Sequence, residues 1–216
     1  EPRGHSGIAH FFEHLMFNET ENLGAGEFDR LLEAAGGETN AATWTDWTYY
    51  YENLPKRYLE LAARLESDRM ANLVLREPQV ASEKEVVANE RRFRVDDDVE
   101  GTANERLYAL AYHRHPYQWP TIGWMEDIQN FTTKDCEAFY RTFYAPNNAN
   151  LIVVGDIDEQ ETLAVVEKYY GRLPSSRIPK RARVSEAPPR KPRSLTLALP
   201  TSTEKLDIGF HGPAFA

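Results

Sequence analysis

The chain has 216 residues, of which 41% are hydrophobic and 27% are charged, so it is long enough to bury a core and does not have the composition of a disordered polypeptide. Its 25 basic and 34 acidic residues give a formal net charge of −9, which argues against nucleic-acid binding as the main activity. A single cysteine, Cys136, excludes an internal disulfide and a cysteine-rich metal site. No apolar run is long enough to predict a transmembrane helix.

Apolar periodicity and helix-starting residues predict helices at 8–17, 27–35, from 55 through at least 70, 78–94, 100–112, 132–143 and 159–170. Ser6 is placed to cap the first of these helices. Residues rich in Thr, Trp and Tyr predict paired strands at 38–45 and 46–53, and an apolar run predicts a buried strand at 149–155. This irregular order, with hairpin-type strands, favours an α+β fold over a doubly wound sheet.

The ends of the sequence and one internal segment bear on its organisation. The chain begins at Glu1 without a basic-then-apolar leader and ends in an apolar stretch, so we expect a piece of a longer protein.

Residues 177–193 carry seven basic side chains, one acidic side chain and four prolines. We expect a solvated connector there, with a polyanion-binding strip as the alternative; no aromatic residues interleave for base stacking.

The first predicted helix carries a possible metal site. His10 and His14 are four residues apart, so both imidazoles lie on one helix face and can bind one metal ion. Glu13 emerges beside them, in the position of a general base that acts on a water without binding the metal. Two histidines that share a helix face by chance are the alternative.

A pair of acidic residues on the 78–94 helix offers a third ligand. At about 100° per residue, Glu83 falls about 20° from Glu90, whereas Glu85 falls about 140° away, toward solvent. The same stripe as Glu83 and Glu90 is predicted to carry Val86, Val87 and Phe93. Carboxylates that face a core are costly without a cation, so one of them is a candidate ligand and the other a candidate supporting group. Salt bridges to Arg91, to Arg94 or to the neighbouring helix are the alternative.

The segment His10-x-x-Glu13-His14, followed 76 positions later by Glu90, resembles the inverted zinc motif of the pitrilysin-type (inverzincin) metalloproteases. That family includes insulin-degrading enzyme and the mitochondrial processing peptidase. The resemblance extends over nearly the whole chain, and it is strongest to the compact bacterial members of the family. It also rests on Gly7-Ile8-Ala9, Leu15-Met16-Phe17, Ala35-Gly36-Gly37, Asn40-Ala41 with Thr43, Glu83, His115-Pro116-Tyr117, Pro146-Asn147-Asn148-Ala149 and Val153-Val154-Gly155-Asp156.

The resemblance implies a role for each matching residue. The implied zinc ligands are His10, His14 and Glu90. Glu13 is implied as the general base, and Glu83 as a carboxylate that supports the zinc site. Asn40 and Ala41 match the edge strand along which family members bind the peptide substrate, for which an ordinary hairpin strand is the alternative.

The resemblance also implies a fold and partners. It predicts a mostly antiparallel sheet flanked by helices, like one half of the mitochondrial processing peptidase, in a clamshell completed by a second homologous half or a partner subunit. The expected organisation is a zinc-binding catalytic part (1–176), the basic connector (177–193) and further strands of the same half (194–216). The implied activity is Zn²⁺-dependent hydrolysis of peptides or unfolded segments, in the periplasm or cytoplasm of a bacterium.

Two other functions remain open. One is a non-proteolytic scaffold or substrate-binding subunit of the same family, although such members typically lose the histidines or the base. The other is a zinc-dependent lyase that shares the H-x-x-E-H motif but uses a cysteine as its third ligand. Cys136 lies far from the position that such a ligand would need, and we expect it to be a small buried residue.

Overall fold

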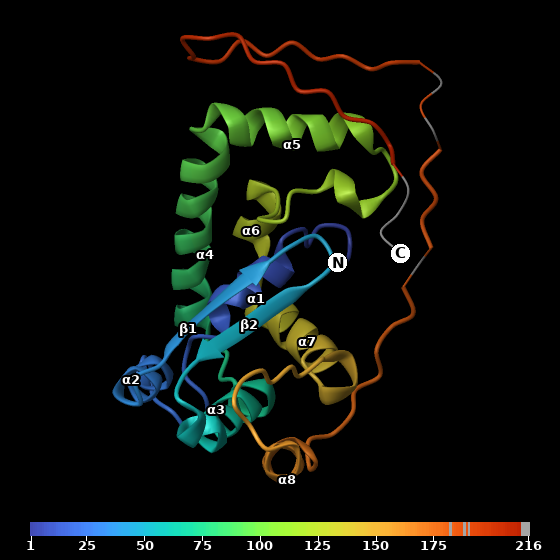
Figure 1. Ribbon diagram of the computed structural model, residues 1–216. Coiled ribbons are helices and arrows are strands. Elements are labelled where there is room, and N and C mark those ends of the chain that lie inside the picture. Colours follow the sequence, from blue (N-terminus) through green and yellow to red (C-terminus); the bar gives the residue numbers. More distant parts are fainter. Residues whose placement is uncertain (182, 188, 190, 213–216) are drawn as a thin grey trace. The chain divides into compact units, whose positions relative to one another are not determined.

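The computed structural model describes residues 1–181, 183–187, 189 and 191–212. Its helices are α1 (Ile8–Leu15), α2 (Glu27–Ala34), α3 (Leu59–Asn72), α4 (Glu77–Arg91), α5 (Val99–Ala111), α6 (Met125–Asn130), α7 (Thr133–Phe143) and α8 (Glu159–Tyr170), shown in Figure 1. Its strands are β1 (Glu38–Thr43) and β2 (Thr48–Asn53). Single 3₁₀ turns occur at η1 (Lys56–Tyr58), η3 (Pro116–Gln118) and η4 (Pro146–Asn148), and a π-helical turn, η2 (Arg92–Asp96), follows α4. None of the described helices is long and apolar enough to cross a membrane.

The chain divides into two compact units. Unit 1 comprises Glu1–Phe11, Lys84–Phe131 and Arg181–Ala216, and unit 2 comprises Phe12–Glu83 and Thr132–Lys180. The division passes through α1 and α4, and each of these helices is continuous along its own length.

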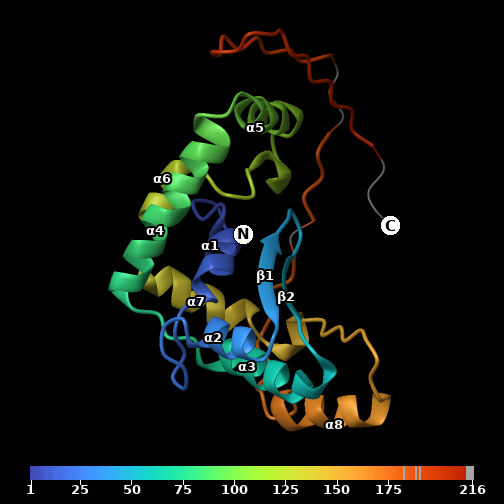
Figure 2. The same ribbon diagram turned by 60° about the vertical axis from the view of Figure 1, so that its left-hand side comes forward.

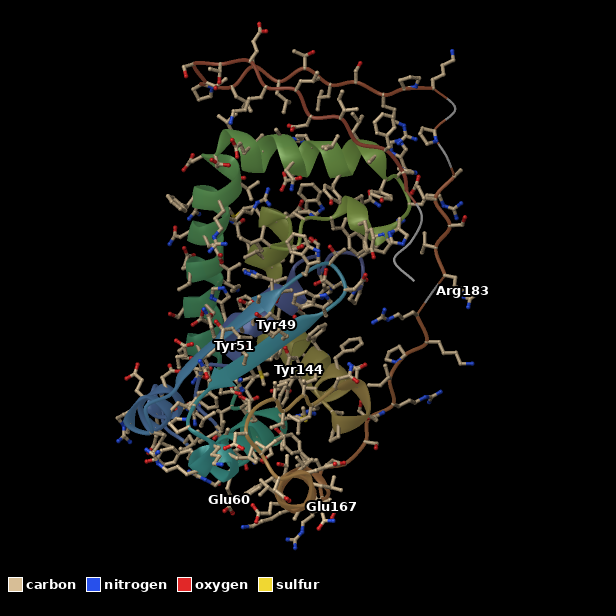
Figure 3. The ribbon with its side chains drawn as sticks, in the orientation of Figure 1. Tyr49, Tyr51, Glu60, Tyr144, Glu167 and Arg183 are labelled. Carbon is tan, nitrogen blue, oxygen red and sulfur yellow. The ribbon has the colours of Figure 1, made fainter. Side chains whose placement is uncertain are left out.

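In unit 2, β1 and β2 form an antiparallel hairpin, as predicted (Figures 1 and 2). The register pairs Thr43 with Thr48, and the backbone N–H of Trp44 donates to the carbonyl of Trp47 across the turn, at 2.8 Å. The side chains alternate between two faces, so Tyr50 is partly buried. Tyr49 and Tyr51, labelled in Figure 3, are exposed.

The core of unit 2 includes a cluster of Leu23, Phe28, Leu32 and Leu65 from the loop before α2, from α2 and from α3. Phe28 and Leu32 are four residues apart and therefore share one face of α2. This helix ends before Gly36, whose φ of 76° lies in the left-handed region that suits a residue just beyond a helix.

In unit 1, the residues before α1 pack closely against the loop before α6. Gly7 has a φ of 81°, and a Cβ there would lie 2.4 Å from the carbonyl oxygen of Ile122, so only glycine fits. Ser6 does not cap α1, in contrast to the prediction. Its hydroxyl donates to Asp127 at 2.5 Å and accepts from the backbone N–H of Trp124 at 3.0 Å.

The start of α1 is capped instead by the carboxylate of Glu1. One of its oxygens accepts from the backbone N–H of Gly7 at 3.1 Å, and the other accepts from that of Ala9 at 3.0 Å. A carboxylate at a helix N-terminus satisfies amides that have no partner inside the helix, and it interacts favourably with the helix dipole.

The α+β class is confirmed, but the antiparallel sheet is smaller than predicted: within the described residues it has two strands. The strand predicted at 149–155 is wrong, since this segment is irregular and leaves Ile152 80% and Val154 89% exposed. The strands predicted within 194–216 are likewise not formed over 194–212, and residues 213–216 lie outside the described part. A strand completes its backbone hydrogen bonds only with a neighbouring strand, and neither segment has one within the described part of the chain.

Candidate functional site

Helix α1 carries the H-x-x-E-H segment. Its buried side chains are Ile8, Phe11, Phe12 and Leu15, each 0–2% exposed. The polar residues of the same helix, His10, Glu13 and His14, are only partly buried. The apolar side chains hold the helix against the protein interior, and the opposite face presents two imidazoles and a carboxylate one turn apart.

In unit 1, Glu90 of α4 reaches His10. Its Oε2 atom lies 3.5 Å from Nε2 of His10, and its Oε1 atom lies 3.0 Å from Nε of Arg94. The predicted approach of Glu90 to the histidine motif and the alternative salt bridge to Arg94 therefore occur together, on different oxygens of one carboxylate.

In unit 2, Glu83 of the same helix α4 reaches the second histidine. Its Oε2 atom lies 3.6 Å from Nδ1 of His14, and about a fifth of each side chain is exposed. Glu85 is exposed, as the helical periodicity predicts. The two acidic residues at positions 83 and 90 thus each approach one histidine of α1.

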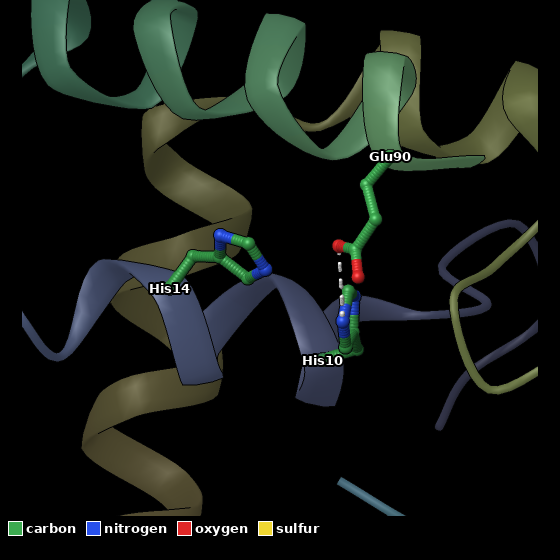
Figure 4. Close-up of side chains that lie close together, drawn as sticks. All are labelled: His10, His14 and Glu90. Carbon is green, nitrogen blue, oxygen red and sulfur yellow. Dashed lines mark ion pairs between the residues drawn. The ribbon is translucent and has the colours of Figure 1, made fainter. Parts of the chain in front are cut away.

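The result is a set of three possible metal ligands. His10, His14 and Glu90 each offer one donor atom, and these atoms all lie within 4.8 Å of one another (Figure 4). Two imidazole nitrogens and one carboxylate oxygen are a donor set that suits zinc and leaves a coordination position for water or substrate. The residues present therefore fit a catalytic zinc ion.

The stripe on α4 differs from the predicted one. Its fully buried side chains are Val80 and Val87, with Ala88 and Arg91 nearly so. Glu83 and Glu90 lie at the border of this face, each about one-fifth exposed. The prediction that Val86 and Phe93 share the buried stripe is wrong, because they are 46% and 78% exposed. Phe93 belongs to the π-helical turn, where the residues no longer follow the 100° step of an α-helix.

Glu13 contacts the hairpin. The hydroxyl of Thr43, the last residue of β1, donates to Oε2 of Glu13 at 2.5 Å. In the sequence, Thr43 stands out only as one of the positions that resemble the pitrilysin-type family. Thr43 lies two residues beyond Ala41 on β1, so the local pattern predicts that both side chains point to the same face of the strand. The local sequence does not show that Glu13 is the partner of Thr43.

A second contact joins the hairpin to α1. The phenol of Tyr50 donates to the backbone carbonyl of Phe12 at 3.4 Å and pairs with the phenol of Tyr144 at 2.8 Å. Burial raises the pKa of both phenols above the usual value of tyrosine, so both remain protonated and act as hydrogen-bond donors. Tyr50 therefore supports the turn of α1 that carries Glu13.

Asn40 and Ala41 lie in the middle of β1. The side-chain oxygen of Asn40 accepts from the backbone N–H of Ala41 at 2.8 Å. In the described part of the chain, β2 pairs with one edge of β1, and the other edge has no strand beside it. Both residues therefore lie on a strand that, among the described residues, is paired along one edge only.

Cys136, the 113–117 segment and the basic connector lie outside this site. Cys136 is fully buried in α7, as predicted. His113 is exposed, and the ring of His115 accepts from the backbone N–H of Tyr117 at 3.3 Å, where it caps a 3₁₀ turn. The described part of the connector is irregular, and its Glu186 carboxylate accepts from the backbone N–H groups of residues 113–115.

Comparison with known proteins identifies the family. Residues 1–123 match the family described as "Insulinase (Peptidase family M16)", and residues 130–216 match the "Peptidase M16 inactive domain". The chain therefore belongs to peptidase family M16, the pitrilysin-type family. All the metal-ligand candidates and Glu13 fall within the first of these two matches.

Individual relatives agree with this assignment. The chain is 42% identical, over 173 residues, to the zinc protease PqqE of Helicobacter pylori, and the match covers 80% of this chain and 39% of the relative. It is similar to the crystal structure of a protease from Helicobacter pylori, with a TM-score of 0.81, 39% identity and coverage of 87% of this chain and 45% of that chain. It is also similar to the first half of the periplasmic protease PqqL from Escherichia coli, with a TM-score of 0.75, 28% identity and coverage of 85% and 40%.

These matches confirm the predicted fold of a single peptidase half. The chain spans about two fifths of the length of the Helicobacter relative.

Proposed function

We propose that this chain carries the zinc ligands and the general base of a metalloendopeptidase. The observation that supports it best is the convergence of His10, His14 and Glu90 within 4.8 Å, with Glu13 on the same turn of α1. Membership of peptidase family M16, and the description of its relatives as zinc proteases, point to the same chemistry.

In this proposal, His10, His14 and Glu90 hold Zn²⁺. A zinc ion with three protein ligands supplies a Lewis acid that polarises a carbonyl and lowers the pKa of water to about 7. Glu83 orients the imidazole of His14 from its other side, as carboxylates commonly do for histidines that bind a metal. Arg94 holds the second oxygen of Glu90 and limits the rotation of that carboxylate.

Glu13 transfers the proton. Its carboxylate accepts a proton from the water that attacks the scissile carbonyl and then delivers it to the leaving nitrogen. The peptide binds as an extended strand along the open edge of β1, at Asn40 and Ala41, through main-chain hydrogen bonds. This mode of binding favours peptides and unfolded segments over folded proteins.

The active enzyme requires more than this chain. We propose that a second homologous half, in the same polypeptide or as a partner subunit, closes over the site and supplies further groups that bind the substrate. The alternative function is a non-proteolytic scaffold or substrate-binding subunit. The presence of both histidines, Glu13 and Glu90 favours the peptidase.

Zinc content and peptide cleavage, measured on the full-length protein that carries this chain, test the proposal. Elemental analysis of the wild type should find about one zinc per site, and a quenched fluorogenic peptide should be cleaved. His14→Ala should lose both zinc and cleavage. Glu13→Gln should keep the zinc and lose cleavage by roughly 10² to 10⁴, because the amide cannot accept the proton.

His113→Ala serves as the control, since it removes an exposed imidazole outside the motif and should change neither measurement. Zinc retained in full by His14→Ala would contradict the ligand assignment. A wild type that binds zinc but cleaves no peptide, in the presence of its second half, would identify a scaffold subunit.

A further inference from the structure

Two threonine hydroxyls and the carboxylate of Glu13 form a directed hydrogen-bond chain. The hydroxyl oxygens of Thr43 and Thr48 lie 3.0 Å apart across the last pair of the hairpin, and the hydroxyl of Thr43 lies 2.5 Å from Oε2 of Glu13. An ionised carboxylate only accepts, so the single proton of Thr43 is donated to Glu13. Thr48 must therefore be the donor in its contact with Thr43.

We propose that Thr43 is a positioning residue for the general base, and that it couples the orientation of Glu13 to the peptide-binding hairpin. This inference rests on the proposed function of Glu13 as the base. The hydroxyl of Thr43 holds one carboxylate oxygen in place, and the second oxygen is left to accept the proton from the attacking water.

The contact restricts the rotation of a long side chain. A glutamate has three side-chain torsions, and the partly buried Glu13 lies on the face of α1 that is not packed against the core. A hydrogen bond to an ionised carboxylate is shorter and stronger than one between neutral groups. The donation from Thr48 strengthens it further, because each hydrogen bond in such a chain polarises the next.

The position of Thr43 in the strand makes the coupling possible. It lies on β1 two residues after Ala41, and its side chain is partly buried. Within the described residues, β1 pairs with a strand along one edge only. Tyr50 anchors the neighbouring strand to the carbonyl of Phe12, the residue before Glu13. A peptide that pairs with β1 therefore binds to the same rigid hairpin that orients the base.

The alternative is that Thr43 only helps the hairpin to pack. Replacing the hydroxyl with a methyl group distinguishes the two roles, because it removes the hydrogen bond to Glu13 and leaves the packing unchanged. Valine has the shape of threonine and a high strand propensity, so it preserves packing but cannot donate. Serine keeps the donor and loses the methyl group. Comparing the valine and serine variants therefore separates the effect of the hydrogen bond from the effect of packing.

The test compares Thr43→Val, Thr43→Ser and the control Thr45→Val in the zinc-loaded full-length protein. Thr45 lies in the exposed turn of the same hairpin. Thr43→Val should lower kcat by roughly 10- to 100-fold, because a misplaced base loses the productive geometry. Its KM, zinc content and melting temperature should stay those of the wild type. Thr43→Ser should recover most of kcat, and Thr45→Val should match the wild type.

A double-variant cycle shows whether Thr43 acts through the base. If it does, Thr43→Val should have no further effect on kcat in the Glu13→Gln background. Thr48→Val should lower kcat less than Thr43→Val, since the direct bond to Glu13 survives.

The inference is overturned if Thr43→Val keeps wild-type kcat, if its loss of kcat comes with an equal loss of folding or zinc, or if serine fails to restore the rate. These outcomes are distinct from failure of the proposed function, which would appear as near wild-type cleavage by Glu13→Gln alone.

Discussion

The Nδ1 atom of His14 lies 3.6 Å from Oε2 of Glu83, whereas Glu85, two residues further along the same helix, is exposed. Glu83→Gln should therefore weaken zinc binding by roughly 10- to 100-fold, the range for loss of a carboxylate that orients a ligating histidine. Competition with a chelator measures this affinity. Glu85→Gln is the matched control and should change stability by no more than about 0.5 kcal/mol. Equal effects of the two substitutions on zinc affinity would contradict the assigned role of Glu83.

The buried guanidinium of Arg91 organises the core of unit 1. Its Nη1 atom donates to Glu105 at 2.7 Å and to the carbonyl of Gly123 at 2.8 Å, and both charged side chains are less than a tenth exposed. Arg91→Met should lower the free energy of unfolding by about 3–5 kcal/mol, because it leaves the Glu105 carboxylate buried without its cation. Denaturant titration measures this change. Arg92→Met, at an exposed neighbouring position, is the control.

A second substitution separates the lost pair from lost packing. Adding Glu105→Leu to Arg91→Met removes the orphaned charge, so the double variant should regain much of the stability that the single variant loses. A double variant that is less stable than Arg91→Met would show that the charge of Glu105 is not the cause.

The pKa of Glu52 is raised to about 9, first by burial and then by the nearby Glu66 carboxyl, although Arg69 donates to both carboxyls. Between the ordinary glutamate value near 4.5 and about 9, the native state holds a proton that the unfolded state releases. Stability therefore falls as pH rises through this window, by at most about 1.4 kcal/mol per pH unit.

Glu52→Gln should flatten this pH dependence, because glutamine mimics the protonated carboxyl and still accepts from Arg69. Melting temperatures at pH 5, 7 and 9 provide the measurement. Glu38→Gln, on the exposed face of the same hairpin, should retain the wild-type slope. The same slope in wild type and Glu52→Gln would show that this carboxyl is ionised throughout.

Glu186 ties the basic connector to the segment that follows α5. Its carboxylate accepts from the backbone N–H groups of His113, Arg114 and His115 at 3.1, 2.7 and 2.9 Å. These hydrogen bonds lower the pKa of the Glu186 carboxyl from 4.5 to about 2, and the bond from the N–H of His115 has the largest effect. Their contribution is complete above the ordinary glutamate pKa and is lost as the pH falls toward about 2.

Glu186→Gln should therefore speed hydrogen exchange of the amides at 113–115 at neutral pH, since a neutral acceptor forms weaker bonds. Mass spectrometry or NMR measures the exchange. Glu204→Gln, another exposed acidic position of unit 1, should leave it unchanged. Unaltered exchange in Glu186→Gln would show that the connector is not held there.

The local periodicity of the sequence determined the elements that carry the site. The spacing of His10 and His14 alone places two imidazoles on one face of α1, because four residues complete about one helical turn. In the same way, the helical step predicted that Glu83 and Glu90 differ from Glu85 in their surroundings. The strand-forming Thr, Trp and Tyr residues of 38–53 predicted the hairpin. The capping box of Thr132 and Asp135 at the start of α7 is equally local, since its hydrogen bonds join residues three positions apart.

Tertiary structure decided which groups meet. The contacts of Glu13 with Thr43, of His14 with Glu83 and of His10 with Glu90 join residues 30 to 80 positions apart, and no local pattern encodes such a pairing. The same reason explains the errors at 149–155 and 194–212, because an apolar segment becomes a strand only if a distant segment pairs with it. Hydrogen bonds inside a helix close within four residues, whereas those of a sheet and of a catalytic site depend on where the rest of the chain folds.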